Sequence, residues 1–299
     1  MSFASVSFLL FFLVVLLLLL LVQRVLPFAE IKRRIICQGI LLIASYVFYG
    51  WWNMRLCLLL MGITWISFFT AVKKDEKHLR QSRISLLIGV GTPLAVLGIF
   101  KYYDFFVTSF CDVFHLTPGV LNLILPVGIS FYTFQALSYT IDVYTGKIEK
   151  EKSFLQFALY LSFFPQLVAG PIVKASEFLP QLKENRKVTL AGLESGIQIF
   201  VFGMFKKVVL ADNISVFVDE VYRSPQIFGS GTVALAVAAY AIQIYMDFSG
   251  YSDMAIGCAK CMGYELPVNF NLPYISHNVS EFWNCLLYTS PSPRDRTRS

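Results

Sequence analysis

Four carboxylates and three asparagines lie within residues 243–283, in a chain otherwise dominated by apolar residues. They are Asp247, Asp253, Glu265, Glu281, Asn269, Asn271 and Asn278. A charged side chain at the centre of a bilayer costs roughly 2.5–3.5 kcal/mol on insertion scales, so it usually faces protein or a water-filled cavity. We therefore expect these groups to line a polar cavity, where they could position a substrate by hydrogen bonds. The alternative is an interfacial loop in which the carboxylates are solvated.

The elements around this segment must place the two aspartates. Asp247 follows the apolar run 232–245, so we expect it at or near the end of a membrane helix, with Asp253 shortly after it. Ser249 and Gly250 between them would allow a bend. Backbone groups freed by a bend are tolerated at membrane depth only beside protein or water.

A second polar set lies in the apolar segment 121–143, which Pro126 and Gly128 interrupt early. Its members recur at three- and four-residue steps, a spacing that forms one stripe on a helix: Tyr132, Gln135, Tyr139 and Asp142. A polar stripe on a membrane helix faces either a neighbouring helix or a cavity. We slightly favour the cavity.

The cysteines and histidines give weaker evidence for a chemical role. Cys258 and Cys261 form a single C-x-x-C, which is weak evidence for metal or redox chemistry. Two small residues in a tightly packed helix is the better interpretation, and we assign no metal site. We give no chemical role to His78, in a basic loop, or to His115, in an aromatic segment.

The composition identifies the fold class. Apolar residues make up 56% of the 299 residues and charged residues only 15%, with repeated apolar runs of near-bilayer length. We predict an all-α, polytopic transmembrane protein with re-entrant segments. The net charge of +6 does not indicate nucleic acid, because the bases form short clusters between apolar runs, as topology determinants do.

Those clusters predict a topology. Residues 5–22 read as a retained first span, and the bases at 24–34 place the following loop in the cytoplasm. Spans 35–52, 56–72 and 84–100 follow, with an aromatic belt at 46–52 and a basic cytoplasmic loop at 73–83. For 101–119 we expect a short interfacial helix on the outer side. Further apolar segments occupy 190–210 and 232–246.

The apolar segment 154–173 breaks this alternation. A full crossing would place the basic residues of 174–187 outside, and Pro165, Gly170 and Pro171 interrupt the segment late. We predict that it enters the membrane and returns, leaving both of its flanks cytoplasmic.

Four ordered blocks, over some 160 residues, resemble a known family. They are LPVGISFYTFQALSYTIDVY (125–144), FFPQLVAGPI (163–172), QIYMDFSGYSDMAIG (243–257), and NFNLPYIS (269–276) followed by EFW (281–283). These blocks resemble the membrane-bound O-acyltransferases (MBOATs), in particular the bacterial branch that includes alginate O-acetyltransferase and the D-alanyl transfer protein of teichoic acids. The first 100 residues agree in character only.

The resemblance implies acyl transfer across a bacterial inner membrane by a multi-pass protein. It implies a cytoplasmic thioester donor, such as acetyl-CoA or an acyl carrier protein, with no bound cofactor. The acceptor would be a polysaccharide hydroxyl or a downstream periplasmic or extracellular acetylation protein, and a tunnel histidine would be the general base. Membrane lipids would be further partners. We expect a reaction chamber lined by Gln135, Asp247, Ser249, Tyr251, Asp253, Asn269, Asn271 and Glu281.

The chain departs from the family after Trp283. The family's EFW block continues into basic residues and a Trp-His pair, whereas here NCLLYTSPSPRDRTRS follows. We expect residues 1–283 to form an incomplete MBOAT domain and residues 284–299 to be a non-native or disordered tail. The catalytic residue is then unknown, because His277 falls at a variable position of the family, and the 299-residue chain should be inactive.

Two other function classes stay open. A transporter or flippase would also carry intramembrane carboxylates and interrupted helices. Paired, similar halves are frequent in transporters, and no second copy of the 243–283 pattern occurs. A purely structural subunit is the third possibility.

Overall fold

The computed structural model describes residues 2–24, 29–75, 78–114, 119, 121, 123–168, 170–269, 274 and 276–279. Regular structure within them is helical, without a strand, which confirms the all-α prediction. Among the described helices, three are long and apolar enough to cross a membrane: α1 (Val6–Arg24), α4 (Leu79–Phe114) and α11 (Ser230–Cys261). The other predicted crossings stay predictions.

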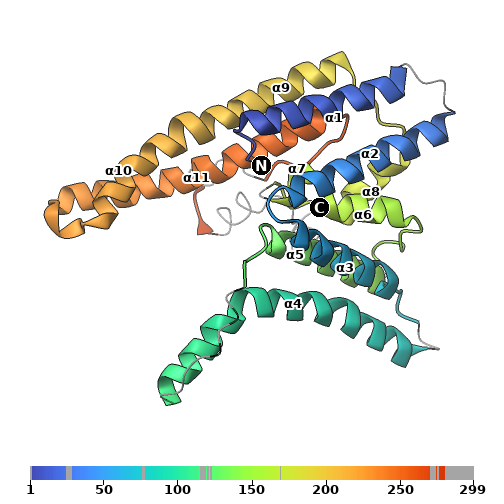
Figure 1. Ribbon diagram of the computed structural model, residues 1–299, viewed down its shortest axis with the longest axis horizontal. Helices are drawn as coiled ribbons and strands as arrows, with labels where there is room; N and C mark the ends of the chain where they lie inside the picture. The colour runs from blue at the N-terminus through green and yellow to red at the C-terminus, as the bar shows by residue number, and fades with distance from the viewer. Residues whose placement is uncertain are drawn as a thin grey trace. The chain divides into compact units, whose positions relative to one another are not determined.

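The described residues form two compact units, one within 1–33, 169–173 and 185–299, the other within 34–168 and 174–184. In the first unit, α9 (Leu190–Met204), the π-helix η1 (Phe205–Ala211) and α10 (Asp212–Arg223) follow without a break. The short 3-10 helix η2 (Pro225–Ile227) then leads into α11, which runs back beside them, as Figure 1 shows. α1 lies against α9, where the rings of Phe8 and Phe200 are 6.2 Å apart.

Glycines bring α9 and α11 into backbone contact. A Cβ added to Gly203 would lie 2.6 Å from the Gly250 carbonyl oxygen, and one added to Gly250 would lie 2.8 Å from that of Gly203. Seven residues away on each helix, Gly196 and Gly257 have the same reciprocal relation. The pairing is antiparallel, and small residues of this kind let membrane helices approach closely.

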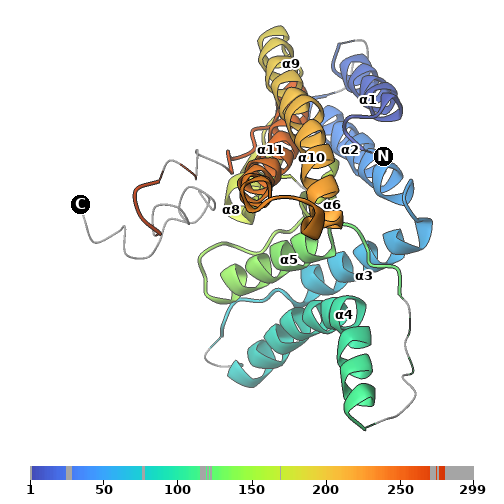
Figure 2. The same ribbon diagram turned by 90° about the vertical axis from the view of Figure 1, so that its left-hand side faces the viewer.

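The second unit is built from α2 (Glu30–Gly50, from Arg34 on), α3 (Met54–Thr70), α4, α5 (Ile129–Tyr144), α6 (Phe154–Ser162), α7 (Phe164–Leu167) and α8 (Ala175–Lys183). Figure 2 shows α3, α4 and α5 side by side. Its core is aromatic: the Phe157 ring lies 4.5 Å from that of Tyr139 and 5.6 Å from that of Phe68. All three side chains are buried.

Two predictions about this unit were wrong. Residues 101–114 do not form a separate interfacial helix, because α4 continues from Leu79 to Phe114 as one 36-residue helix that bends along its length (Figure 2). The stripe on α5 does not line a cavity at its two tyrosines. Tyr132 packs on Tyr49 of α2 and Tyr139 on Phe157 of α6, and both tyrosines are fully buried.

The predicted early break in 121–143 is confirmed, since α5 begins at Ile129. Gly128 precedes it with φ +75°, a left-handed conformation that favours glycine. A Cβ at this position would collide with the carbonyl oxygen of Leu167, at the end of α7. The glycine thus allows the start of α5 to pack on the interrupted segment that follows α6.

The segment 154–173 is broken, as predicted, into α6, α7 and a non-helical stretch. α6 has nine residues, or about 14 Å, against about 30 Å for the hydrocarbon core. The flanks of the broken segment meet: Lys183 Nζ lies 2.9 Å from Oε2 of Glu151, whose side chain is 4% exposed. Segments that leave and return at one place have this geometry.

Other predicted cytoplasmic segments reach the same region of the second unit. Arg34 donates a hydrogen bond from its guanidinium to the Lys183 carbonyl oxygen, and Gln38 donates to that of Leu182 at 2.5 Å. The backbone N–H of Lys74 donates to the carbonyl oxygen of Tyr144 at the end of α5, 3.1 Å away. These hydrogen bonds therefore connect different segments that we predict to be cytoplasmic.

Candidate functional site

The two aspartates of the 243–283 segment lie in the interior of α11. Our prediction that Asp247 lies at or near the end of a membrane helix was wrong, because α11 is helical from Ser230 to Cys261, through Ser249 and Gly250. Asp247 is 17 residues after Ser230, or about 26 Å along the axis. Ionisable residues inside an apolar helix of this length indicate a functional site.

Each aspartate is paired with a lysine from η1. Lys206 Nζ donates to Oδ2 of Asp253 at 2.6 Å, and these side chains are only 16% and 20% exposed. Lys207 Nζ lies 2.7 Å from Oδ1 of Asp247, whose side chain is 43% exposed. The same ammonium lies 2.7 Å from Oδ1 of Asp212 in α10. We call these five residues the η1–α11 charge cluster.

Aromatic side chains border the charge cluster. Lys206 Nζ lies 4.7 Å from the ring centroid of Phe202, and Lys207 Nζ lies 5.6 Å from that of Tyr251. Such contacts stabilise a desolvated cation. The hydroxyl of Tyr251 is 3.4 Å from Oγ of Ser2, before α1. The charge cluster therefore joins groups from η1, α10 and α11, with Tyr251 linking it to the N-terminal segment.

A π-helix carries both lysines. Such helices are rare and frequently lie at functional sites. Here the seven residues of η1 interrupt an otherwise α-helical stretch, and two consecutive lysines reach two acids six residues apart on α11.

The other predicted chamber residues are placed as follows. Ser249 is buried on α11, and Asn269 is buried with its Oδ1 accepting a hydrogen bond from the backbone N–H of Ile172 at 3.4 Å. This bond joins two of the blocks that carry the family resemblance. Gln135 is buried on α5 of the second unit. Asn271 and Glu281 lie outside the described residues.

Sequence reasoning found the aspartates but missed their partners. Lys206 and Lys207 looked like charges near the end of an apolar run, and Asp253 is 47 residues from Lys206. The spacing of the glycines carried a usable signal. With Gly203 opposite Gly250 in an antiparallel pair, Lys207 comes within one position of Asp247, its partner in the structure.

The buried pair Cys258 and Cys261 confirms the interpretation as small residues in a packed helix. Both thiols are free, and a Cβ at Gly196 would lie 2.5 Å from Sγ of Cys261. His78 is exposed beside Asp75, whereas His115 lies outside the described residues. Within the described part of the chain, no group of three or more His, Cys, Asp or Glu could hold a metal ion.

Comparison with known proteins gives the family. Residues 147–285, which include the charge cluster, match the model of MBOAT, the membrane-bound O-acyltransferase family. Over these residues the chain belongs to that family. The match also covers α6 to α8, the region of the predicted re-entrant segment.

Curated relatives extend the likeness toward the N-terminus. The chain is 40% identical over 252 residues to a probable alginate O-acetylase AlgI of Pseudomonas putida, covering 82% of this chain and 51% of the relative. It is 37% identical over 270 residues to a peptidoglycan O-acetyltransferase of Helicobacter pylori, covering 81% and 51%. A teichoic acid D-alanyltransferase of Streptococcus thermophilus is 29% identical over 172 residues, covering 56% and 41%. The chain thus spans about half the length of the first two relatives.

Proposed function

We propose that the protein containing this chain is a membrane O-acyltransferase that acetylates hydroxyls of an exported or cell-envelope polysaccharide, such as alginate. The observation that carries the proposal is the MBOAT match over residues 147–285, together with O-acetylase relatives near 40% identity. Alginate and peptidoglycan are the acceptors named for these relatives, so the polymer is the open part of the proposal.

The reaction moves an acyl group from a cytoplasmic thioester, from acetyl-CoA or an acyl carrier protein, to the acceptor. The hydroxyl oxygen attacks the thioester carbonyl carbon, a general base takes the hydroxyl proton, and the thiol leaves with a proton. A periplasmic or extracellular acetylation protein could receive the acyl group first. The histidine that the family resemblance implies as base lies outside the motifs present here.

The charge cluster suits positioning rather than proton abstraction. The Asp253 carboxylate already accepts the hydrogen bond of Lys206, and Asp247 shares Lys207 with Asp212. Fixed pairs of this kind orient nearby groups, and orientation alone contributes much to catalysis. We place Asp247, Tyr251 and Asp253 beside the path of the acyl group on this basis.

We place the protein in the bacterial inner membrane as a multi-pass protein. In support, the segments with Lys and Arg clusters are joined by hydrogen bonds and an ion pair in the second unit. Positive loops of this kind mark the cytoplasmic side.

Deletion of the complete gene distinguishes the proposal from a flippase. We expect deletion to remove the acetate that mild alkali releases from the exported polymer, while the amount of exported polymer stays the same. Restoring the complete reading frame should return the acetate. Loss of polymer export with normal acetylation of the remainder would indicate a transporter. Unchanged acetate and unchanged export would reject acetyl transfer.

A further inference from the structure

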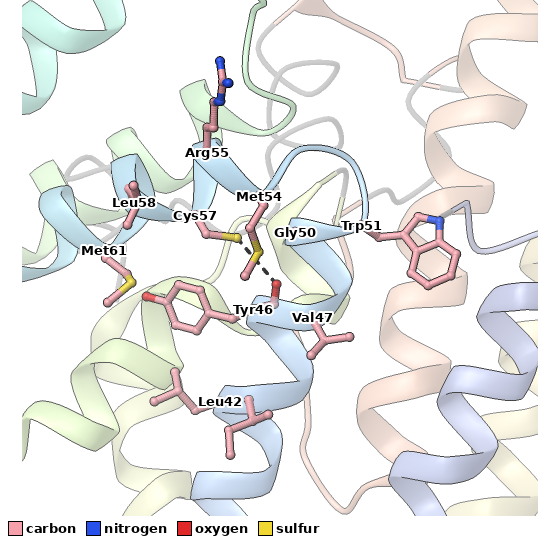
Figure 3. A pocket seen from close by; sticks show the side chains of 11 residues that line it. Leu42, Tyr46, Val47, Gly50, Trp51, Met54, Arg55, Cys57, Leu58 and Met61 are labelled. Carbon is pink, nitrogen blue, oxygen red and sulfur yellow. Dashed lines mark hydrogen bonds between the residues drawn. The ribbon is translucent and has the colours of Figure 1, made fainter.

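A groove of about 800 Å³ lies between α2 and α3 in the second unit (Figure 3). Its volume is within the range of about 300–1,000 Å³ typical of ligand sites. Apolar side chains from the end of α2 and the start of α3 form most of it, among them Leu42, Tyr46, Val47, Cys57, Leu58 and Met61.

One polar group of the groove, the Cys57 thiol, is already bonded to the protein. The Cys57 thiol donates to the Tyr46 carbonyl oxygen, with a sulfur–oxygen distance of 3.6 Å (Figure 3). Gly50 has no side chain to fill the space, and a Cβ there would lie 3.1 Å from Sδ of Met54. The groove therefore offers a ligand dispersion contacts and apolar surface, which suits a hydrocarbon chain.

The outer walls expose large apolar side chains. Leu58 is 70% exposed, and along the same helix Trp65 and Phe69 are also exposed. α3 is apolar over 17 residues, and its neighbour α4 is a candidate membrane span. The groove therefore opens at an apolar helix surface, and in the hydrocarbon core of a bilayer such a surface is surrounded by lipid acyl chains.

One end of the groove differs in chemistry. Among the described residues that line it, Arg55 alone carries a charge, and its exposed side chain extends from the first turn of α3 beyond the apolar groups (Figure 3). Trp51 lies at the same end and is exposed, as expected for a side chain at headgroup level. Of the predicted aromatic belt, Phe48 and Tyr49 are instead buried.

We propose that this groove binds one anionic phospholipid, with an acyl chain along the apolar side chains of α2 and α3 and the lipid phosphate on the Arg55 guanidinium. A guanidinium binds phosphate oxygens through two parallel N–H donors. The absence of an acid among the described lining residues leaves that positive charge uncompensated at the groove. The site needs no acyl transfer and is independent of the proposed function.

Lipid retention by the full chain tests the proposal. The protein in nonionic detergent is offered equal amounts of phosphatidylglycerol and phosphatidylcholine with the same acyl chains, and bound lipids are counted by native mass spectrometry. We expect one lipid with about a five-fold preference for phosphatidylglycerol, the size expected of one cation near a membrane surface. Arg55→Gln should abolish the preference. The control Arg83→Gln, an exposed arginine of α4 outside the groove, should keep it.

A second pair of variants tests the acyl chain. Leu58→Trp fills the groove and should reduce retention of both lipids, whereas Phe69→Trp, on the same helix outside the groove, should not. Both positions are exposed, so the variants should melt like the wild type. Equal retention of the two lipids by the wild type, or equal effects of Arg55→Gln and Arg83→Gln, would overturn the proposal. Displacement of phosphatidylglycerol by equimolar inorganic phosphate would also overturn it.

Discussion

At the scale of single residues, the charge cluster raises the question of why two lysines and three aspartates lie among apolar helices. Removing an ion from water costs several kcal/mol, and a partner offsets this only when the geometry is good. Here the distances from the two ammonium groups to the three carboxylates are 2.6–2.7 Å. Each charged side chain of the cluster therefore needs its partner to offset the cost of leaving water.

The Lys206–Asp253 pair is the first test. Because both side chains are largely buried, Lys206→Met or Asp253→Asn alone should lower the free energy of unfolding by about 3 kcal/mol. The double variant removes both charges and should lose clearly less than the sum. Denaturant unfolding in detergent measures all three.

Asp212→Asn is the control for this cycle. Its side chain is 51% exposed, so the loss of its bond to Lys207 should cost less than about 1 kcal/mol. Losses at Lys206 and Asp253 that add without coupling would contradict the pair.

At the scale of elements, the glycines of α9 and α11 determine the register that makes the charge cluster possible. Gly203 and Gly250 place the backbones in contact, and both lysines, Asp247 and Asp253 lie within four residues of these glycines. A shift of one helix along the other would separate the charges in a place where water is scarce. Packing and electrostatics therefore depend on the same contact.

Gly203→Ala tests this dependence. The new methyl group would lie 2.6 Å from the Gly250 carbonyl oxygen, so the helices must separate. We expect a loss of about 1–3 kcal/mol, the usual cost of overpacking, measured by thermal unfolding in detergent. Gly231→Ala on α11 has nothing within 4 Å and should be neutral or stabilising by up to about 1 kcal/mol, as alanine favours helix. Similar losses at both glycines would contradict the register.

The elements also indicate how far sequence reasoning can go. Hydropathy predicted apolar spans within the long helices α1, α4 and α11, and Pro126 with Gly128 predicted the break before α5. Both predictions were possible because these signals are local in the sequence. The continuity of α4 past Phe100 was missed, since polar residues such as Asp104 and Asp112 resemble a helix end. The lysine partners were missed because pairing depends on the register between two helices, which one segment alone does not encode.

At the scale of the whole molecule, bonds in the second unit connect the segments that carry clusters of Lys and Arg. The segments predicted to be cytoplasmic are 24–34, 73–83 and the two flanks of 154–173. Arg34, Lys74, Glu151 and Lys183 make the bonds that join them. The broken segment between Glu151 and Lys183 can leave and re-enter one face without a crossing. A single side for all four is the simplest topology that keeps these bonds.

Accessibility of introduced cysteines tests this topology. With the six native cysteines replaced by alanine, single cysteines are placed at the exposed positions Lys74, Glu149, Glu184 and Trp52. An impermeant maleimide added to right-side-out vesicles should label only Trp52→Cys, and the other three should react after permeabilisation. Glu149→Cys and Glu184→Cys should be labelled from the same side of the membrane. The reason is that nearby Glu151 and Lys183 form an ion pair with a distance of 2.9 Å. Labelling of Glu184→Cys in sealed vesicles would mean that 154–173 crosses the membrane, and the re-entrant interpretation would be wrong.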